Sequence, residues 1–511
     1  MAGTSDASDL RRSVYLLLTA VSVAIAAAKV VGAENVLEPS RYKSPAADGY
    51  GNERERKWPT ERPDPTPMFS SNDKSRWATV RAIVEDRTYA IGKRTYPDLK
   101  NPKIYSDVGI LAEPQYKSLD IVLRPLDPAT ATGPAETEFY SSKPPLFATL
   151  LAGEYWVLKR CLGWSITTDR WLVIPTILFT VNVIPFAVYL ILLARLIEAT
   201  GKSDFGRLLA FTAACFGTFL VTFSGTLNNH LPAAICVLFA TYPLLRAVVE
   251  NRDMMSGGYA CCGFFAGFAT TFDLPAAAFL AGIGVPLLVA RPRQAVLFFV
   301  PAAAVPLVCL FACNYAAMGT FRLPYSEFGG PWYTFEGSHW AKLQLPTRPH
   351  GIDFADEPKD VYAFHLLFGH HGWFSLTPIW FLAVVGLVSV GLHSARDLKK
   401  LAGGGKGSVW TVPLFSGMVL AVSIVVVGFY VDRTNNYGGF TSGPRWLFWL
   451  TPLWVLAIPP TADRLANSAT GRLVAAILLG VSVLSVFYPA WNPWRPPWIL
   501  QWMEFMGWIG Y

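Results

Sequence analysis

The sequence predicts an all-α protein that crosses a membrane many times. Of its 511 residues, 52% are hydrophobic and only 15% are charged, whereas soluble domains carry about 25% charged residues. Long apolar runs follow one another at short intervals, and the short loops between them carry lysine or arginine. The net charge of +7 therefore bears on orientation in the membrane, and we expect no nucleic acid partner.

The first apolar run extends from about Val14 to Val31 and is long enough to cross a bilayer, which takes about 20 residues. We expect residues 1–31 to form a retained N-terminal transmembrane anchor, because Lys29 interrupts a clean cleavage region. The alternative is a signal peptide cleaved near Ala33. In both cases the residues that follow lie outside the cytoplasm.

Residues 32–170 are predicted to form a large extracytoplasmic loop with surface helices. Its first part is rich in Pro, Arg, Glu and Asp and is typical of an irregular tether. Apolar residues at helical spacing predict a helix at 75–84, with Ser71 and Asn72 as caps. Short extended segments are expected at 89–91, 103–105 and 120–123. Residues 146–162 carry three charges on an amphipathic pattern, which predicts a helix lying on the membrane surface.

The rest of the chain divides into membrane-spanning and exposed parts. We expect a transmembrane bundle at 171–318, a second extracytoplasmic loop at 319–373, C-terminal transmembrane helices at 374–489 and an extracytoplasmic tail at 490–511. With the first helix this gives about eleven spans; the others are expected at about 171–194, 206–225, 230–249, 257–273, 275–290, 294–318, 374–392, 410–431, 446–460 and 471–489.

The basic residues give the orientation. With the N-terminus in the cytoplasm, every short inner loop carries lysine or arginine, as the positive-inside rule requires. The protein is therefore expected in the cell membrane (inner or plasma membrane), with its long loops on the extracytoplasmic face. The seven cysteines lie in or beside apolar runs and show neither disulfide nor metal-ligand spacing.

Two polar motifs in the first loop carry groups suited to chemistry. Asp73, near the start of the predicted helix, either caps that helix or serves as a general base that takes a proton from an attacking hydroxyl. Lys143 precedes Pro144-Pro145 at the border of the first surface helix. The two prolines stiffen the backbone there, so the ammonium either binds a phosphate or headgroup or snorkels to the interface.

Two further motifs lie in the later loops. His370-His371 stand where the chain re-enters the membrane, and paired histidines indicate a metal site or proton relay, or else interfacial anchors. Arg445 heads a late apolar run beside Trp446. Its planar guanidinium suits phosphate oxygens, and the alternative is again a snorkelling side chain.

Together these motifs resemble the GT-C membrane glycosyltransferases. The matching residues are Asp73-Lys74-Ser75-Arg76-Trp77-Ala78, then Tyr140-Ser-Ser-Lys143-Pro144-Pro145-Leu146, and late in the chain Gly443-Pro444-Arg445-Trp446 followed by Pro452. The order of elements matches from about residue 70 to 460, and it is most similar to the protein O-mannosyltransferase-like and aminoarabinose lipid A transferase-like branch.

The resemblance implies a GT-C fold and a reaction. It makes Asp73 the base on the acceptor, while Lys143 and Arg445 bind the phosphate of a polyprenyl-phosphate sugar donor, and the sugar is transferred with inversion on the extracytoplasmic face. Attack at the anomeric carbon expels a lipid phosphate, whose growing charge needs fixed cations. The acceptor, whether lipid, protein or glycan, is left open. Residues expected at the acceptor or in support are Arg76, Asp120, Glu138, Tyr140, His370 and His371.

Other functions stay open from the sequence. The sequence identifies no cofactor with certainty, and a divalent metal is compatible with the chemistry, although no ligand spacing identifies its site. A transporter or flippase of lipid-linked saccharide would need ionisable residues deep in several spans, and few are present. A non-catalytic membrane scaffold whose loops bind a partner is the third hypothesis.

Overall fold

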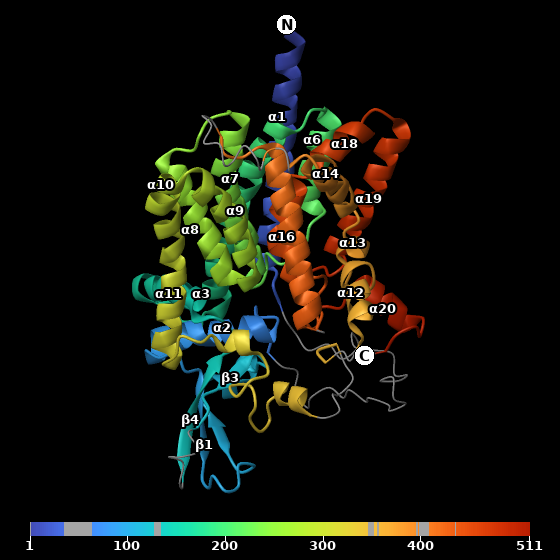
Figure 1. Ribbon diagram of the computed structural model, residues 1–511. Coiled ribbons are helices and arrows are strands. Elements are labelled where there is room, and N and C mark those ends of the chain that lie inside the picture. Colours follow the sequence, from blue (N-terminus) through green and yellow to red (C-terminus); the bar gives the residue numbers. More distant parts are fainter. Residues whose placement is uncertain are drawn as a thin grey trace.

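The computed structural model describes residues 2–34, 64–126, 134–345, 352–354, 357–394, 397, 408–434 and 436–510. Most of the expected tether before Ser71 lies outside these residues. The described chain is a bundle of roughly aligned helices with a small β-sheet at one end (Figure 1). The predicted helical fold with a large first loop is confirmed.

Six helices of the described residues are long and apolar enough to cross a membrane. Two shorter apolar helices, Leu274–Ala290 and Trp380–Gly391, accompany them. Length and composition alone thus identify six spans among the described residues, and the total of about eleven stays a prediction. The six are α1 (Ala2–Val31), α4 with α5 (Arg170–Leu178 and Ile184–Thr200, joined by a π-turn), α7 (His230–Val249), α10 with α11 (Pro292–Gln294 and Val300–Met318), α16 (Val412–Arg433) and α19 (Ala469–Phe487).

Three of the expected spans are shorter or broken, and the one at 374–392 is split into α13 (Trp373–Leu376) and α14 (Trp380–Gly391). The one at 206–225 is a helix only as α6 (Asp204–Phe216), with turns after Gly217. The one at 446–460 is split into a 3-10 segment, η10 (Arg445–Leu450), and two short helices, α17 (Thr451–Val455) and α18 (Pro459–Leu465). Prolines near the start of both short helices explain the breaks, because proline cannot donate the backbone hydrogen bond that continues a helix.

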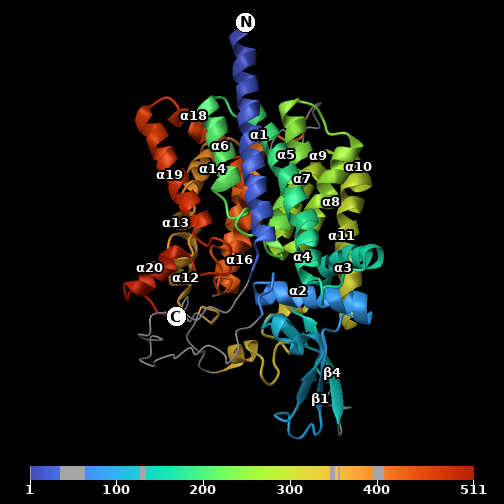
Figure 2. The ribbon, with the colours of Figure 1, turned by 180° about the vertical axis from the view of Figure 1, so that it is seen from behind.

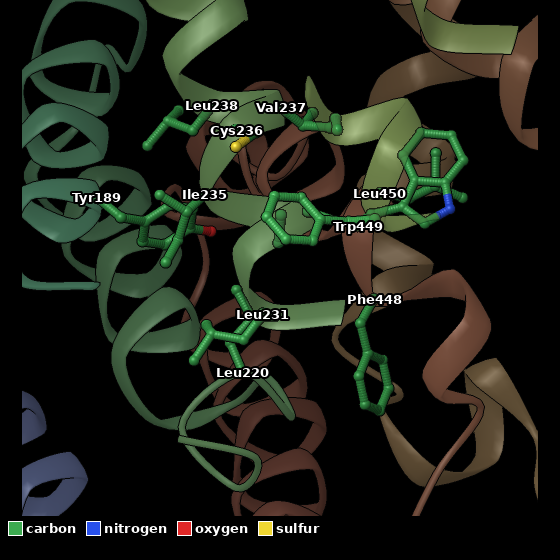
Figure 3. Close-up of a cluster of buried hydrophobic side chains, with 14 of the residues drawn as sticks. Tyr189, Leu220, Leu231, Ile235, Cys236, Val237, Leu238, Phe448, Trp449 and Leu450 are labelled. Atoms are coloured by element: carbon green, nitrogen blue, oxygen red, sulfur yellow. The ribbon is translucent and has the colours of Figure 1, made fainter. Parts of the chain in front are cut away.

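The main hydrophobic core runs through the bundle and includes a cluster between α5, α7 and η10. Figure 3 shows Tyr189 of α5, Leu231 and Ile235 of α7, and Trp449 of η10 among its buried side chains. The helix α8 (Ser256–Phe272) packs closely against the α10–α11 segment: a Cβ added at Gly263 would lie 2.1 Å from the Phe299 carbonyl oxygen. Glycine is therefore required for this close approach of two backbones. The other bundle helices are α9 (Ala277–Ala290) and α14 (Trp380–Gly391).

The first loop folds into a helix, a sheet and a second helix. Helix α2 (Ser71–Arg81) begins earlier than expected, continues into a π-turn (Ala82–Asp86), and is capped by Ser70 rather than by Ser71 or Asn72. An antiparallel sheet follows, in the order β2-β1-β4-β3, with Arg94 opposite Thr137 in the register of its central pair. Its strands are β1 (Gly92–Tyr96), β2 (Ser106–Val108), β3 (Ile121–Leu123) and β4 (Ala135–Ser141).

The surface helix expected at 146–162 is α3 (Pro145–Leu162). Both α2 and α3 lie across the end of the bundle rather than along it (Figures 1 and 2). The second loop is hydrogen-bonded to the edge strand β3 and to the segment before it. The Leu123 amide donates to the Trp332 carbonyl, and the Trp340 indole donates to the Leu119 carbonyl.

All the long loops gather at the end of the bundle opposite the N-terminus (Figure 1). The short helices there are α12 (Lys359–Leu367), α13 (Trp373–Leu376) and α20 (Trp498–Phe505). The border between these loops and the bundle helices, next to α2 and α3, is therefore enclosed by segments that are distant in sequence. The polar side chains described below lie at this border.

Candidate active site

Asp73 lies in the first turn of α2 and is fully buried. Its backbone N–H donates to Ser70 Oγ (3.1 Å), and its Oδ2 accepts from the backbone N–H of Phe69 (2.9 Å). This reciprocal arrangement resembles a capping box. Burial raises the pKa of Asp73 to about 7, against the lowering effect of the Phe69 amide, of Trp77 and of the charges on Arg76 and Lys74. The carboxyl group thus combines a capping contact with a pKa suited to proton transfer near neutral pH.

Arg76 lies one turn further along α2 and is only 4% exposed. Its Nη2 donates to the side-chain oxygen of Asn229 (3.1 Å). Its Nε and Nη1 are buried and have no hydrogen-bond partner among the residues that the structure describes. Leaving charged donors buried and unpaired is costly, so these groups are arranged to bind an anion.

Lys143 follows β4 and forms an ion pair with Asp120, with 2.8 Å between Nζ and Oδ1. The Ser142 amide donates to the Asp120 carbonyl (3.0 Å), which fixes the two segments together. The ammonium also lies over the Tyr325 ring, 5.2 Å from its centroid. Burial lowers the pKa of Lys143, whereas in Asp120 the neighbouring lysine outweighs burial and lowers the pKa of the carboxyl.

Arg445 is the first residue of η10, and contacts with Gly438 and Trp494 fix its side chain. Its Nε and Nη2 donate to the Gly438 carbonyl (3.2 and 3.0 Å), and its guanidinium lies over the Trp494 ring at 5.0 Å. Its Nη1 lies 3.3 Å from Nε2 of His230, the first residue of α7. The snorkelling alternative does not describe this arrangement, because the guanidinium points into a buried network.

A continuous polar network joins Arg445 to Arg76. His230 Nδ1 lies 3.0 Å from Asp273 Oδ2, and Asn229 Nδ2 donates to Asp273 Oδ1 (2.6 Å). Since Asn229 also accepts from Arg76, the order is Arg76–Asn229–Asp273–His230–Arg445. The electrostatic interactions of Asp120 reach Lys143, Arg445 and Arg76, so all three cations lie in one electrostatic neighbourhood.

A small pocket opens beside this neighbourhood. It encloses about 260 Å³ of space, its open mouth included, and its lining includes Arg76, Tyr140, Lys143 and Pro144. Its lining residues come from α2, β4, α3 and the end of α11, and these elements lie at the loop end of the bundle in Figure 2. Arg76 and Lys143 lie on its wall, and its free space is close to that of a single water, so a lipid phosphate would have to widen it to enter.

The structure therefore brings some of the predicted residues together and separates others. Lys143, Arg445, Arg76 and Asp120 share one electrostatic neighbourhood; Asp73 interacts electrostatically with Arg76, but it is not among the described residues that line the pocket. Tyr140 lines the pocket, but its hydroxyl donates to Glu138 (2.5 Å) and accepts from Arg124, in a separate group on the sheet.

His370 and His371 are both fully buried, and their Nδ1 atoms are 2.5 Å apart. Burial and the neighbouring imidazoles lower the pKa of His370, and burial lowers that of His371 to about 3. They belong to a second cluster with Glu357, His365 and Tyr437. Glu357, His365 and His370 each offer a ligand atom, all within 4.8 Å of one another, and could hold a metal ion.

Sequence reasoning missed three members of the network: Asn229, His230 and Asp273. A signal was present, because Asn228-Asn229-His230 interrupts apolar sequence at the head of a predicted span. Asp273 stands at the boundary of the span expected at 257–273. What the sequence could not supply was the contact between positions 44 residues apart.

No family model matches the sequence, and no curated protein matches it significantly. Among solved structures, the chain is similar to the oligosaccharyltransferase of Archaeoglobus fulgidus in its apo form, with a TM-score of 0.45, 10% identity, and coverage of 97% of this chain and 57% of that chain. The same enzyme tethered through a disulfide to an acceptor peptide containing the NVT sequon gives a TM-score of 0.39 at the same identity and coverage.

The chain thus spans 57% of the length of the structures it matches. At this level of similarity no residue role is transferred, so the functional proposal depends on the geometry of the site.

Proposed function

We propose that this chain is an integral membrane glycosyltransferase that uses a polyprenyl-phosphate-linked sugar as donor. The observation that carries the proposal is the buried guanidinium of Arg76, whose Nε and Nη1 have no hydrogen-bond partner among the described residues and which lines one pocket with Lys143. A phosphate is the ligand that two fixed cations at a membrane border suit best. This assigns Arg76 to the donor phosphate rather than to the acceptor side.

In the proposed reaction, an acceptor hydroxyl oxygen bonds to the anomeric carbon while the bond from that carbon to the phosphate oxygen breaks. The electron pair of the broken bond stays on the lipid phosphate, where Arg76, Lys143 and Arg445 stabilise the added charge. The acceptor proton passes to Asp73, whose pKa of about 7 keeps a fraction ionised at neutral pH. Attack opposite the leaving phosphate inverts the anomeric centre.

Among the described residues the carboxylates of Asp120 and Asp273 are engaged by Lys143 and by Asn229 and His230, whereas Asp73 is bonded to the Phe69 amide through Oδ2 and its Oδ1 has no hydrogen-bond partner. We propose that the three basic side chains stabilise the charge at the phosphate. A divalent metal at Asp73 is compatible with this assignment.

The test of donor binding uses farnesyl phosphate as a short lipid phosphate and farnesol as its uncharged counterpart. We expect Arg76→Gln and Lys143→Gln to weaken farnesyl phosphate binding by about tenfold or more, since each removes charged hydrogen bonds to the anion. Farnesol binding should not change. Arg322→Gln is the matched control, because this arginine is 84% exposed in the second loop. Equal affinity for farnesyl phosphate in the wild type and all variants would contradict the phosphate site.

A further test separates transfer from transport. The transferase releases polyprenyl phosphate from a polyprenyl-phosphate sugar, whereas a flippase moves the donor intact and a scaffold does neither. Detection of the released lipid phosphate by mass spectrometry, with a panel of sugar donors and acceptor hydroxyls, supports the transferase. Movement of an intact donor across the membrane of reconstituted vesicles, without release of lipid phosphate, would contradict the transferase and support the transporter.

A further inference from the structure

The second polar cluster lies away from the phosphate pocket and has its own chemistry. We call Glu357, His365 and His370 the histidine cluster. Glu357 precedes α12, His365 lies in the last turn of that helix, and His370 follows it in a turn. The turn passes close to the ring, since a Cβ at Gly369 would lie 2.2 Å from His365 Nδ1. Three side chains are thus brought together within a stretch of fourteen residues.

The ligand atoms of the histidine cluster suit a transition metal. One carboxylate and two imidazoles, with atoms all within 4.8 Å of one another, need only small side-chain movements to reach a common ion. Two histidines and a glutamate with an open fourth position form a common zinc ligand set, with bonds of about 2.0–2.2 Å. Imidazole ligands favour zinc, copper or nickel over magnesium or calcium.

The surroundings of the histidine cluster resemble the outer contacts of a metal site. His371 is fully buried, its Nδ1 lies 2.5 Å from that of His370, and its Nε2 has no hydrogen-bond partner in the described part of the chain. The Tyr437 hydroxyl donates to Glu357, and the Tyr437 ring stacks on His371 with centroids 5.0 Å apart. Such contacts orient metal ligands in proteins.

We propose that Glu357, His365 and His370 form a binding site for one zinc-class divalent ion. The site joins the second outer loop to the third, because Tyr437 binds Glu357 while the next residue, Gly438, accepts both hydrogen bonds from Arg445. A bound ion would fix the loop that holds Arg445. The site stands on the geometry of the histidine cluster and does not depend on the proposed transferase activity.

The test uses the full chain purified with a tag that contains no histidine, stripped with a chelator and then given zinc or cobalt alone. We expect about one tightly bound zinc per chain by elemental analysis. Cobalt should give the visible absorption of a four-coordinate site. His365→Ala and Glu357→Gln should both lose the cobalt spectrum and the bound zinc.

The matched control is His339→Ala. His339 lies in the same loop and also faces a carboxylate, with 3.1 Å between its Nε2 and Asp353, so it should retain full metal binding. Zinc should raise the thermal unfolding temperature of the wild type and of His339→Ala, and leave that of His365→Ala unchanged.

Two results would overturn the site. One is the absence of tight zinc and cobalt binding in the folded wild type. The other is binding that persists in both His365→Ala and Glu357→Gln, or that falls equally in His339→Ala. Glu357→Gln keeps the size of the side chain, so a failure of His365→Ala to fold would still leave a decisive variant.

Discussion

Three cations share a small region of this protein, Arg76 buried and Lys143 and Arg445 partly buried, and each is held by different contacts. Lys143 is neutralised directly by Asp120. Arg445 is fixed by a carbonyl and an aromatic ring. Arg76 has one amide partner, and two of its donors have no partner among the described residues. Buried charges are costly without partners, so Arg76 is the position where a ligand would bring the largest gain.

The ionisation of Asp73 should control both rate and stability. As a base it acts when ionised, so the transfer rate should rise with pH and level off above about 7, the pKa that burial gives it. Asp73→Asn should lose this pH dependence together with most of the activity, because an amide cannot accept the proton. Transfer measured between pH 5.5 and 9 would test this.

Whereas Asp73→Asn should lower the activity, it should raise the stability of the fold above the pH at which the unfolded chain loses its proton. The pKa of Asp73 is about 7 in the fold and 3.8 ordinarily, so the folded state holds a proton that the unfolded chain releases as pH rises between these values. The fold therefore loses stability over that interval, by up to about 4 kcal/mol.

Asp73→Asn should consequently leave the melting temperature unchanged near pH 4 and raise it at pH 8. The amide oxygen can still accept from the Phe69 N–H, so the capping contact is preserved. Ser70→Ala, which removes the cap, is the control and should lower stability at both pH values. A transfer rate that Asp73→Asn leaves unchanged would exclude Asp73 as the base and leave it with the capping role alone.

At the scale of elements, the sheet depends on one buried arginine. Arg94 on β1 is 2% exposed; it binds both oxygens of Asp107 on β2 and donates to the Glu336 carbonyl of the second loop. Its guanidinium lies 3.6 Å from the centroid of the Tyr105 ring. One side chain therefore connects two strands and the loop that covers them.

We expect Arg94→Ala to destabilise the sheet by roughly 3 kcal/mol, because it leaves a carboxylate without its partner. Lys93→Ala, at the neighbouring position, is the control: Lys93 is exposed and pairs with Glu136 at the surface, so no measurable change should follow. Hydrogen exchange of the β1 and β4 amides would compare them, and equal protection in both variants would contradict the role of Arg94.

The helices could be predicted better than the strands, for a physical reason. A long apolar run is a local property, so α7, α16 and α19 lie close to their expected ranges. The strands depend on pairing with distant partners: the segments at 89–91 and 103–105 were placed just before β1 and β2. The break at 446–460 follows from prolines that the apolar composition obscured.

The site residues divide in the same way into those that local sequence predicts and those that depend on tertiary contacts. Lys143 and Arg445 were identified from short motifs, because a cation beside an apolar run is visible locally. The contact between Asp273 and Asn229 joins two helices, and only packing of the bundle creates it. The capping role of Ser70 was missed because the helix begins four residues before its apolar pattern does.

At the scale of the whole molecule, the sheet and the helices α2, α3 and α12 lie at one end of the bundle (Figures 1 and 2), and these elements carry residues of the pocket and of the histidine cluster. The short loops rich in lysine and arginine lie at the opposite end, with the N-terminus. A lipid phosphate in the headgroup layer would meet the loop end, provided that this end faces away from the cytoplasm as the positive-inside rule predicts.

Orientation can be tested by cysteine labelling in intact cells. Lys100, in the segment between β1 and β2, and Arg293, in α10 at the other end of the bundle, are both exposed. In a background where the exposed Cys161 and Cys309 are replaced by serine, Lys100→Cys should react with a membrane-impermeant maleimide. Arg293→Cys should react only after the cells are permeabilised. The background protein without either substitution controls for the remaining cysteines. Labelling of Arg293→Cys but not Lys100→Cys in intact cells would place the pocket on the cytoplasmic side, and an extracytoplasmic transferase would then be excluded.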